Sequence, residues 1–106
     1  MRSRRPVHSP VHDVFGRAVR ETRARRGLSQ EELGFQAKLH RNYVGAIERG
    51  EINPTLRVIL KLSKGLQVCP SQLAELTEIR WEEMRDENNH AEPLDETKAL
   101  GGRRGG

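Results

Sequence analysis

The sequence predicts an all-α protein, built as a five-helix bundle with disordered termini. Three observations support this fold class. Phe15, Val19 and Thr22 recur at the i, i+4, i+7 spacing of one helix face. Residues that begin or end helices, such as Ser29 and Gly50, divide the chain into short segments. No stretch shows the alternation of apolar and polar residues that marks a strand, and there is no internal repeat.

The first helix is expected to begin at Pro10 and to stop at Gly27. Ser9 suits the N-cap, and a proline at the first helical position lacks an N–H that would have no partner there. Residues 1–9 are rich in arginine and have no periodicity, so we interpret them as a disordered basic arm.

Two short helices joined by a tight turn are expected between Ser29 and Gly50. Ser29 and Glu32 have the spacing of a capping box, which begins the first of the two. Residues 38–40 form the turn, and the second helix spans 41–49. The inward-facing positions of the two helices are Leu33, Ala37, Val44 and Ile47.

A fourth and a fifth helix are expected after Pro54. Cys69 is interpreted as a small core residue, and Ser71 as the N-cap of the fifth helix. The fourth helix is the main hydrophobic block and contains Leu56, Ile59, Leu60, Leu62 and Leu66. The fifth helix is expected to bury Leu73 and Leu76.

The helical domain is expected over residues 10–77, with an acidic extension over 78–106. Residues 78–84 can prolong the fifth helix, although Ile79, Trp81 and Met84 do not form one clean apolar stripe. The remainder of the extension is interpreted as a disordered tail, because it is polar and ends in a glycine-rich segment.

The composition is that of one small domain. The chain has 106 residues, of which 34% are hydrophobic and 32% charged. A core of about 60 residues can still fold alone. No apolar run approaches the roughly 20 residues that span a membrane, and no apolar signal segment follows the basic N-terminus. Cys69 has no partner for an internal disulfide, which fits a reducing cytoplasm.

Charge is distributed unevenly along the chain, although the net charge is only +4. Residues 1–27 carry eight arginines against two acids, whereas residues 75–96 carry nine acids against two arginines. A basic globular part with an acidic tail is typical of a nucleic-acid binder, although ordinary solvated surfaces would give the same pattern.

Motifs for other chemistries are missing from the sequence. There is no glycine-rich phosphate loop within a helical or strand context, and no arrangement of nucleophile and base. We therefore expect no enzyme, no metal and no cofactor. The histidines, which lack the spacing of metal ligands, are His8, His12, His40 and His90.

Residues 41–49 carry polar residues on one side and apolar ones on the other, as a helix that enters the major groove of DNA does. Arg41 and Asn42 stand at its start. Arginine pairs bidentately with guanine and asparagine with adenine, each worth about 1–3 kcal/mol of discrimination. Gly45 and Ala46 have no polar arm and would permit close approach or contact a thymine methyl group. The plainer alternative for Arg41 and Asn42 is a solvated helix start.

Three motifs in this region carry a family resemblance. They are Gly27-Leu28-Ser29-Gln30-Glu31-Glu32-Leu33, Ile47-Glu48-Arg49-Gly50 and Asn53-Pro54-Thr55-Leu56. With them, residues 15–76 resemble the repressor-like helix-turn-helix domain of lambdoid phage repressors and Cro, the XRE family. The string from Leu39 to Gly50 is similar to the restriction-modification controller branch. The resemblance implies a homodimeric transcription regulator that binds a roughly palindromic operator in double-stranded DNA.

Two positions depart from the family pattern. The turn has Lys38 where the family usually has glycine, and a side chain at positive φ costs about 1 kcal/mol, so the turn is expected to be strained or reshaped. Gly34 stands where alanine is usual, which costs roughly 0.5–1 kcal/mol of helix stability and permits a close helix approach.

The resemblance also implies roles for individual residues. The positions that match base-reading positions or flank them are Arg41, Asn42, Tyr43 and Ala46. Positions for phosphate contact are Ser29 and Gln30, with His40, Arg49 and Asn53 as further candidates. Arg23 and Glu48 are expected to form a partly buried ion pair with a structural role.

The dimer interface is expected around the fifth helix, because an exposed tryptophan and methionine beside a small core suit an interface. Its candidate residues are Leu76, Ile79, Trp81 and Met84.

Two alternatives to DNA reading remain open from the sequence. One is an antitoxin-like or other partner-binding protein of the same fold, with the acidic extension folding on a basic partner. The other is RNA binding through the arginine-rich N-terminus and residues 101–106, but no aromatic residues interleave these arginines to stack on bases.

Overall fold

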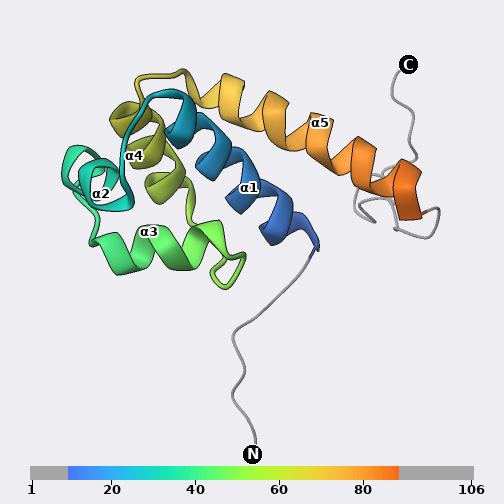
Figure 1. Cartoon of the computed structure of the whole chain (residues 1–106), viewed down its shortest axis with the longest axis horizontal. Helices are drawn as coiled ribbons and strands as arrows, with labels where there is room; N and C mark the ends of the chain where they lie inside the picture. The colour runs from blue at the N-terminus through green and yellow to red at the C-terminus, as the bar shows by residue number, and fades with distance from the viewer. Residues whose placement is uncertain (1–9, 89–106) are drawn as a thin grey trace, which may run out of the picture.

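The computed structural model describes residues 10–88, and within them the fold is all-α, as predicted. The chain folds into α1 (Pro10–Arg25), α2 (Gln30–Ala37), α3 (Arg41–Glu48), α4 (Leu56–Leu66) and α5 (Pro70–Asn88). Figure 1 shows α3 along one side of the bundle and the α4–α5 connection on the opposite side. The expected N-cap at Ser9, the basic arm and the tail beyond residue 88 lie outside the described residues.

All five helices contribute to one core. Leu33, Leu62 and Leu66 have no exposed surface, and burying such a side chain stabilises the fold by roughly 1.5–3 kcal/mol. No helix within residues 10–88 is long and apolar enough to cross a membrane. The buried cluster consists of Val19, Leu33, Ala37, Val44, Ile47, Val58, Leu62, Leu66 and Leu73.

α2 begins and ends as the local sequence predicts. The Ser29 hydroxyl accepts from the Glu32 amide at 3.0 Å, and the Glu32 carboxylate accepts from the Ser29 amide at 2.8 Å. These two bonds are the expected capping box. After α2, Lys38 adopts the left-handed conformation with φ 61° and ψ 45°. The turn therefore keeps the glycine-like geometry with a lysine in it, at a cost of about 1 kcal/mol.

Glycines allow two close approaches around α3. A Cβ on Gly34 would lie 2.5 Å from the carbonyl oxygen of Leu39, so the small residue is needed where α2 meets the turn. A Cβ on Gly16 would collide with the backbone carbonyl of Ile47 and lie 2.7 Å from that of Glu48. α1 consequently crosses the end of α3 at backbone contact, which fixes the direction of α3.

α4 buries only part of the hydrophobic block predicted for it. The Thr55 hydroxyl caps the helix by accepting from the Val58 amide at 3.2 Å. Val58 and Leu62 face the core, but Leu56 is 70% exposed and Leu60 49% exposed. The two exposed leucines lie one turn apart, so α4 has an apolar outer edge that the periodicity did not distinguish from its inner one.

α5 begins two residues earlier than predicted. Pro70 occupies the first turn, and the Cys69 amide donates to the Gln72 side chain at 2.7 Å. Ser71 is therefore inside the helix, and its expected role as N-cap is wrong; proline is favoured at the first position because it has no N–H to satisfy. Cys69 is exposed, so its expected place in the core is also wrong.

α5 continues to Asn88 and runs along α1 (Figure 1). Arg80 connects the two helices, donating from Nη2 to Glu21 at 2.8 Å and from Nε at 3.0 Å. These hydrogen bonds lower the pKa of the Glu21 carboxyl below its ordinary value. Residues 78–88 are thus helical, and their first turn is attached to the bundle by an ion pair.

Candidate nucleic-acid interface

α3 presents a polar edge to solvent while its apolar edge is anchored in the core. Arg41 and Asn42 are exposed, whereas Val44 and Ile47 are buried. The His40 ring caps the helix, with Nδ1 accepting from the Asn42 amide at 3.0 Å. A short helix held in this way can insert its first turn into a groove without unfolding any part of the bundle.

The remaining positions along α3 divide between solvent and core. Ala46 is half-buried, and so is Tyr43, whose ring packs partly against the core cluster. Gly45 is buried: a Cβ there would lie 3.4 Å from Oε1 of Gln30 and 3.1 Å from Nη1 of Arg49. Gly45 therefore lies beneath the ends of two polar side chains. Ala46 keeps an accessible surface.

Arg41 makes a weak contact within the protein. Its Nη1 lies 3.4 Å from Oε1 of Glu31, and both side chains are exposed. Such pairs contribute about 0–1 kcal/mol. Arg41 can therefore leave Glu31 for a base edge at little cost.

The structure brings together Arg23 and Glu48, the two residues of the expected ion pair. Arg23 Nε donates to Glu48 Oε2 at 2.6 Å, and Nη2 donates to Oε1 at 3.1 Å. The side chains are 16% and 2% exposed. The hydrogen bonds to Glu48 raise the pKa of the Arg23 guanidinium above its ordinary value. A third bond, from Arg23 Nη1 to the Leu28 carbonyl at 2.8 Å, attaches the start of α2 to the same pair.

Gln30 joins this network, which sequence reasoning missed. Its Nε2 donates to Glu48 Oε1 at 2.9 Å. The contact places the end of the Gln30 side chain over Gly45, with Oε1 on the side where a Cβ would be. No short-range pattern connects residues 30 and 48, so only a known helix packing could have revealed this bond.

The candidates for phosphate contact border α2 and α3. Ser29 and His40 are exposed and cap the two helices, so their side chains lie beside helix N-termini, where backbone N–H groups favour anions. Asn53 is exposed in the loop that follows α3. Arg49 is exposed at the end of α3 and donates to Glu51 at 2.8 Å, which raises the pKa of its guanidinium.

Comparison with known proteins identifies the family. The helix-turn-helix family model matches residues 19–77. The chain belongs to the helix-turn-helix family. It is a DNA-binding transcription regulator, as the resemblance of its motifs implied.

The similar helix-turn-helix proteins include control proteins. Control protein C.BamHI from Bacillus amyloliquefaciens is 45% identical over 67 residues, which are 62% of this chain and 83% of the relative. Control protein C.SmaI from Serratia marcescens is 36% identical, over 59% of this chain and 75% of the relative. The crystal structure of the restriction-modification controller protein C.AhdI from Aeromonas hydrophila is 47% identical, covers 58% of this chain and 94% of that chain, and superposes with a TM-score of 0.58. These relatives give no support to an antitoxin-like partner protein.

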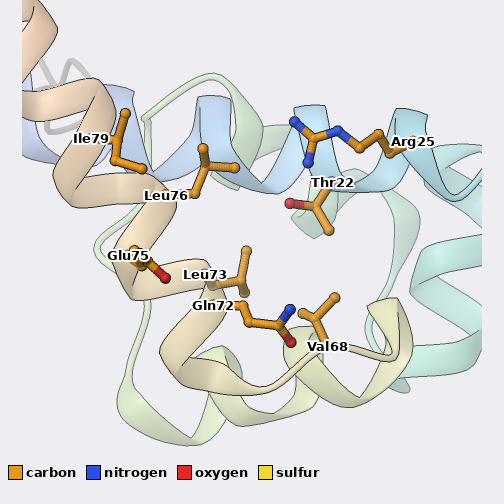
Figure 2. A pocket seen from close by; sticks show the side chains of 8 residues that line it. All are labelled: Thr22, Arg25, Val68, Gln72, Leu73, Glu75, Leu76 and Ile79. Atoms are coloured by element: carbon orange, nitrogen blue, oxygen red, sulfur yellow. The ribbon is translucent and has the colours of Figure 1, made fainter.

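The family match ends at residue 77, so the second half of α5 lies beyond it. Among the residues expected at a dimer interface, Ile79 is 43% exposed, and Leu76, Trp81 and Met84 are half-buried. Leu76 and Ile79 border a groove of about 340 Å³ between α5 and the end of α1. Figure 2 shows them with the rest of its lining: Thr22, Arg25, Val68, Gln72, Leu73 and Glu75.

Proposed function

We propose that this helix-turn-helix regulator acts as a homodimer that reads a roughly palindromic operator, with a restriction-modification locus as its class of target. The outward polar edge of α3 carries the proposal. The similarity to proteins named as restriction-modification controllers supports the class of target. The function is recognition of duplex DNA rather than catalysis.

Base reading is assigned to the first turns of α3. Arg41 donates two hydrogen bonds to a guanine, and Asn42 donates to and accepts from an adenine. Ala46 offers a methyl group to a thymine, and Tyr43 provides a hydroxyl beside the groove. The backbone is held by the phosphate contacts proposed for Ser29, Gln30, His40, Arg49 and Asn53.

Dimerisation is part of the proposal because one eight-residue helix covers only a few base pairs. Two copies with reading helices about 34 Å apart would contact successive major grooves on one face of the duplex. We assign the contact between copies to α5, at Leu76, Ile79, Trp81 and Met84. The outer edge of α4, with Leu56 and Leu60, is the competing apolar surface.

Selection of bound sequences from random duplex DNA tests the reading residues. We expect the wild-type protein to select a two-fold related site. Arg41→Ala and Asn42→Ala should each relax preference at defined positions, by about 1–3 kcal/mol of discrimination. Lys64→Ala removes an exposed cation in the last turn of α4, which leads away from α3 to α5 (Figure 1), and should leave the preference unchanged. A uniform loss of affinity in both reading variants would show that these residues only hold phosphates.

Sedimentation equilibrium tests the dimer surface. Ile79→Glu places a charge on the exposed apolar position of α5 and should shift the dimer towards monomer, because an unpaired charge opposes burial in the interface. Leu60→Glu is the matched change on α4 and should leave the mass unchanged. The reverse result would move the interface to α4.

A further inference from the structure

Lys38 is the cation in the turn between α2 and α3, and neither the family model nor the relatives give it a role. We propose that Lys38 binds a backbone phosphate of the DNA, beside the start of α3. This inference rests on the proposed function of α3. It adds a contact from the one turn position where this chain departs from the glycine expected there.

The backbone holds Lys38 in a fixed orientation. Its φ of 61° is left-handed. Two backbone hydrogen bonds hold the turn: the Lys38 amide donates to the Phe35 carbonyl at 3.3 Å, and the Leu39 amide donates to the Gly34 carbonyl at 2.8 Å. The side chain is exposed. The turn therefore projects a lysine into solvent two residues before the N-cap of α3 and three residues before Arg41.

Within residues 10–88, no carboxylate pairs with Lys38. A shallow hollow beside the turn is lined by Gly34, Phe35, Gln36, Lys38, Leu39 and His40, none of which is acidic. In contrast to Lys38, Arg41 pairs with Glu31 and Arg49 with Glu51. An anion approaching the start of α3 would meet this charge without displacing a carboxylate.

The conformational cost at position 38 also points to a role outside the fold. Among residues 10–88 only Lys38 and Gln67 are non-glycine residues with positive φ. Glycine would adopt the same conformation without steric cost. Residues that keep a strained conformation concentrate at functional sites. Since the Lys38 side chain is exposed, its charge is what the position provides.

Salt-dependent binding to the selected operator duplex tests the proposal. Loss of one phosphate contact lowers the slope of log K against log salt by about 0.9. We expect Lys38→Gly and Lys38→Asn to show this lower slope, so that their deficit relative to wild type shrinks roughly 3.5-fold between 50 and 200 mM salt. Lys38→Arg should retain the wild-type slope because it keeps the charge. Neither neutral variant should have a lower Tm, since glycine and asparagine tolerate this conformation.

Two control variants separate charge from strain. Gln67→Gly removes the steric cost of the same left-handed conformation at the end of α4. Lys64→Gln removes one positive charge from the last turn of α4. Both should keep the wild-type slope. An unchanged slope in Lys38→Gly and Lys38→Asn, with a wild-type protein that still selects its site, would overturn the role of Lys38 alone. A wild-type protein with no site preference would overturn the proposed function itself.

Discussion

We expect Glu48→Ala to lower the free energy of unfolding by about 3–5 kcal/mol, because it leaves the Arg23 guanidinium without its carboxylate in a largely buried position. The same change removes the acceptor of Gln30, which then loses its connection to the end of α3. Urea denaturation followed by circular dichroism measures the effect.

Glu83→Ala is the matched control for this change. Glu83 also accepts hydrogen bonds from an arginine, Arg80, but its side chain is 55% exposed and Arg80 keeps Glu21 as a partner. Its loss should cost less than about 1 kcal/mol. A Glu48→Ala protein that melts at the wild-type temperature would refute the structural importance of the pair.

Gly16→Ala should destabilise the protein by about 3 kcal/mol, although alanine is the better helix former. The added methyl group meets the backbone carbonyls of Ile47 and Glu48, which cannot rotate away as side chains can. Relief requires α1 to move from the end of α3. We therefore also expect weaker operator binding, measured by fluorescence anisotropy under conditions where the variant remains folded.

Gly45→Ala makes the same substitution within a helix where space can be found. The nearest atoms to the new methyl group are the ends of the Arg49 and Gln30 side chains, at 3.1 and 3.4 Å. These ends can shift, so the gain in helix propensity of roughly 0.5–1 kcal/mol should leave stability equal or higher. If Gly16→Ala were as stable as Gly45→Ala, the backbone contact between α1 and α3 would not be too close to admit a methyl group.

Most of the polar edge of α3 could be predicted from the sequence, because the signals that indicate it are local. The spacing of Val44 and Ile47 sets which side of α3 is buried, and the polar residues that precede them, Arg41 and Asn42, are left facing outwards. Gly45 shows the limit of this reasoning. Its burial depends on Gln30, which belongs to another helix and reaches it only through the packing of α2 on α3.

The sequence by itself determined the all-α class, the five helices and the capping box at Ser29. Each of these depends on dihedral preferences and hydrogen bonds within a few residues, which the local sequence specifies. Tertiary structure alone decided that Leu56, Leu60 and Cys69 face solvent, and that Gln30 and Arg80 are tied to Glu48 and Glu21. Burial and long-range hydrogen bonds depend on which helix faces meet, and that choice is made by the packing of the whole bundle.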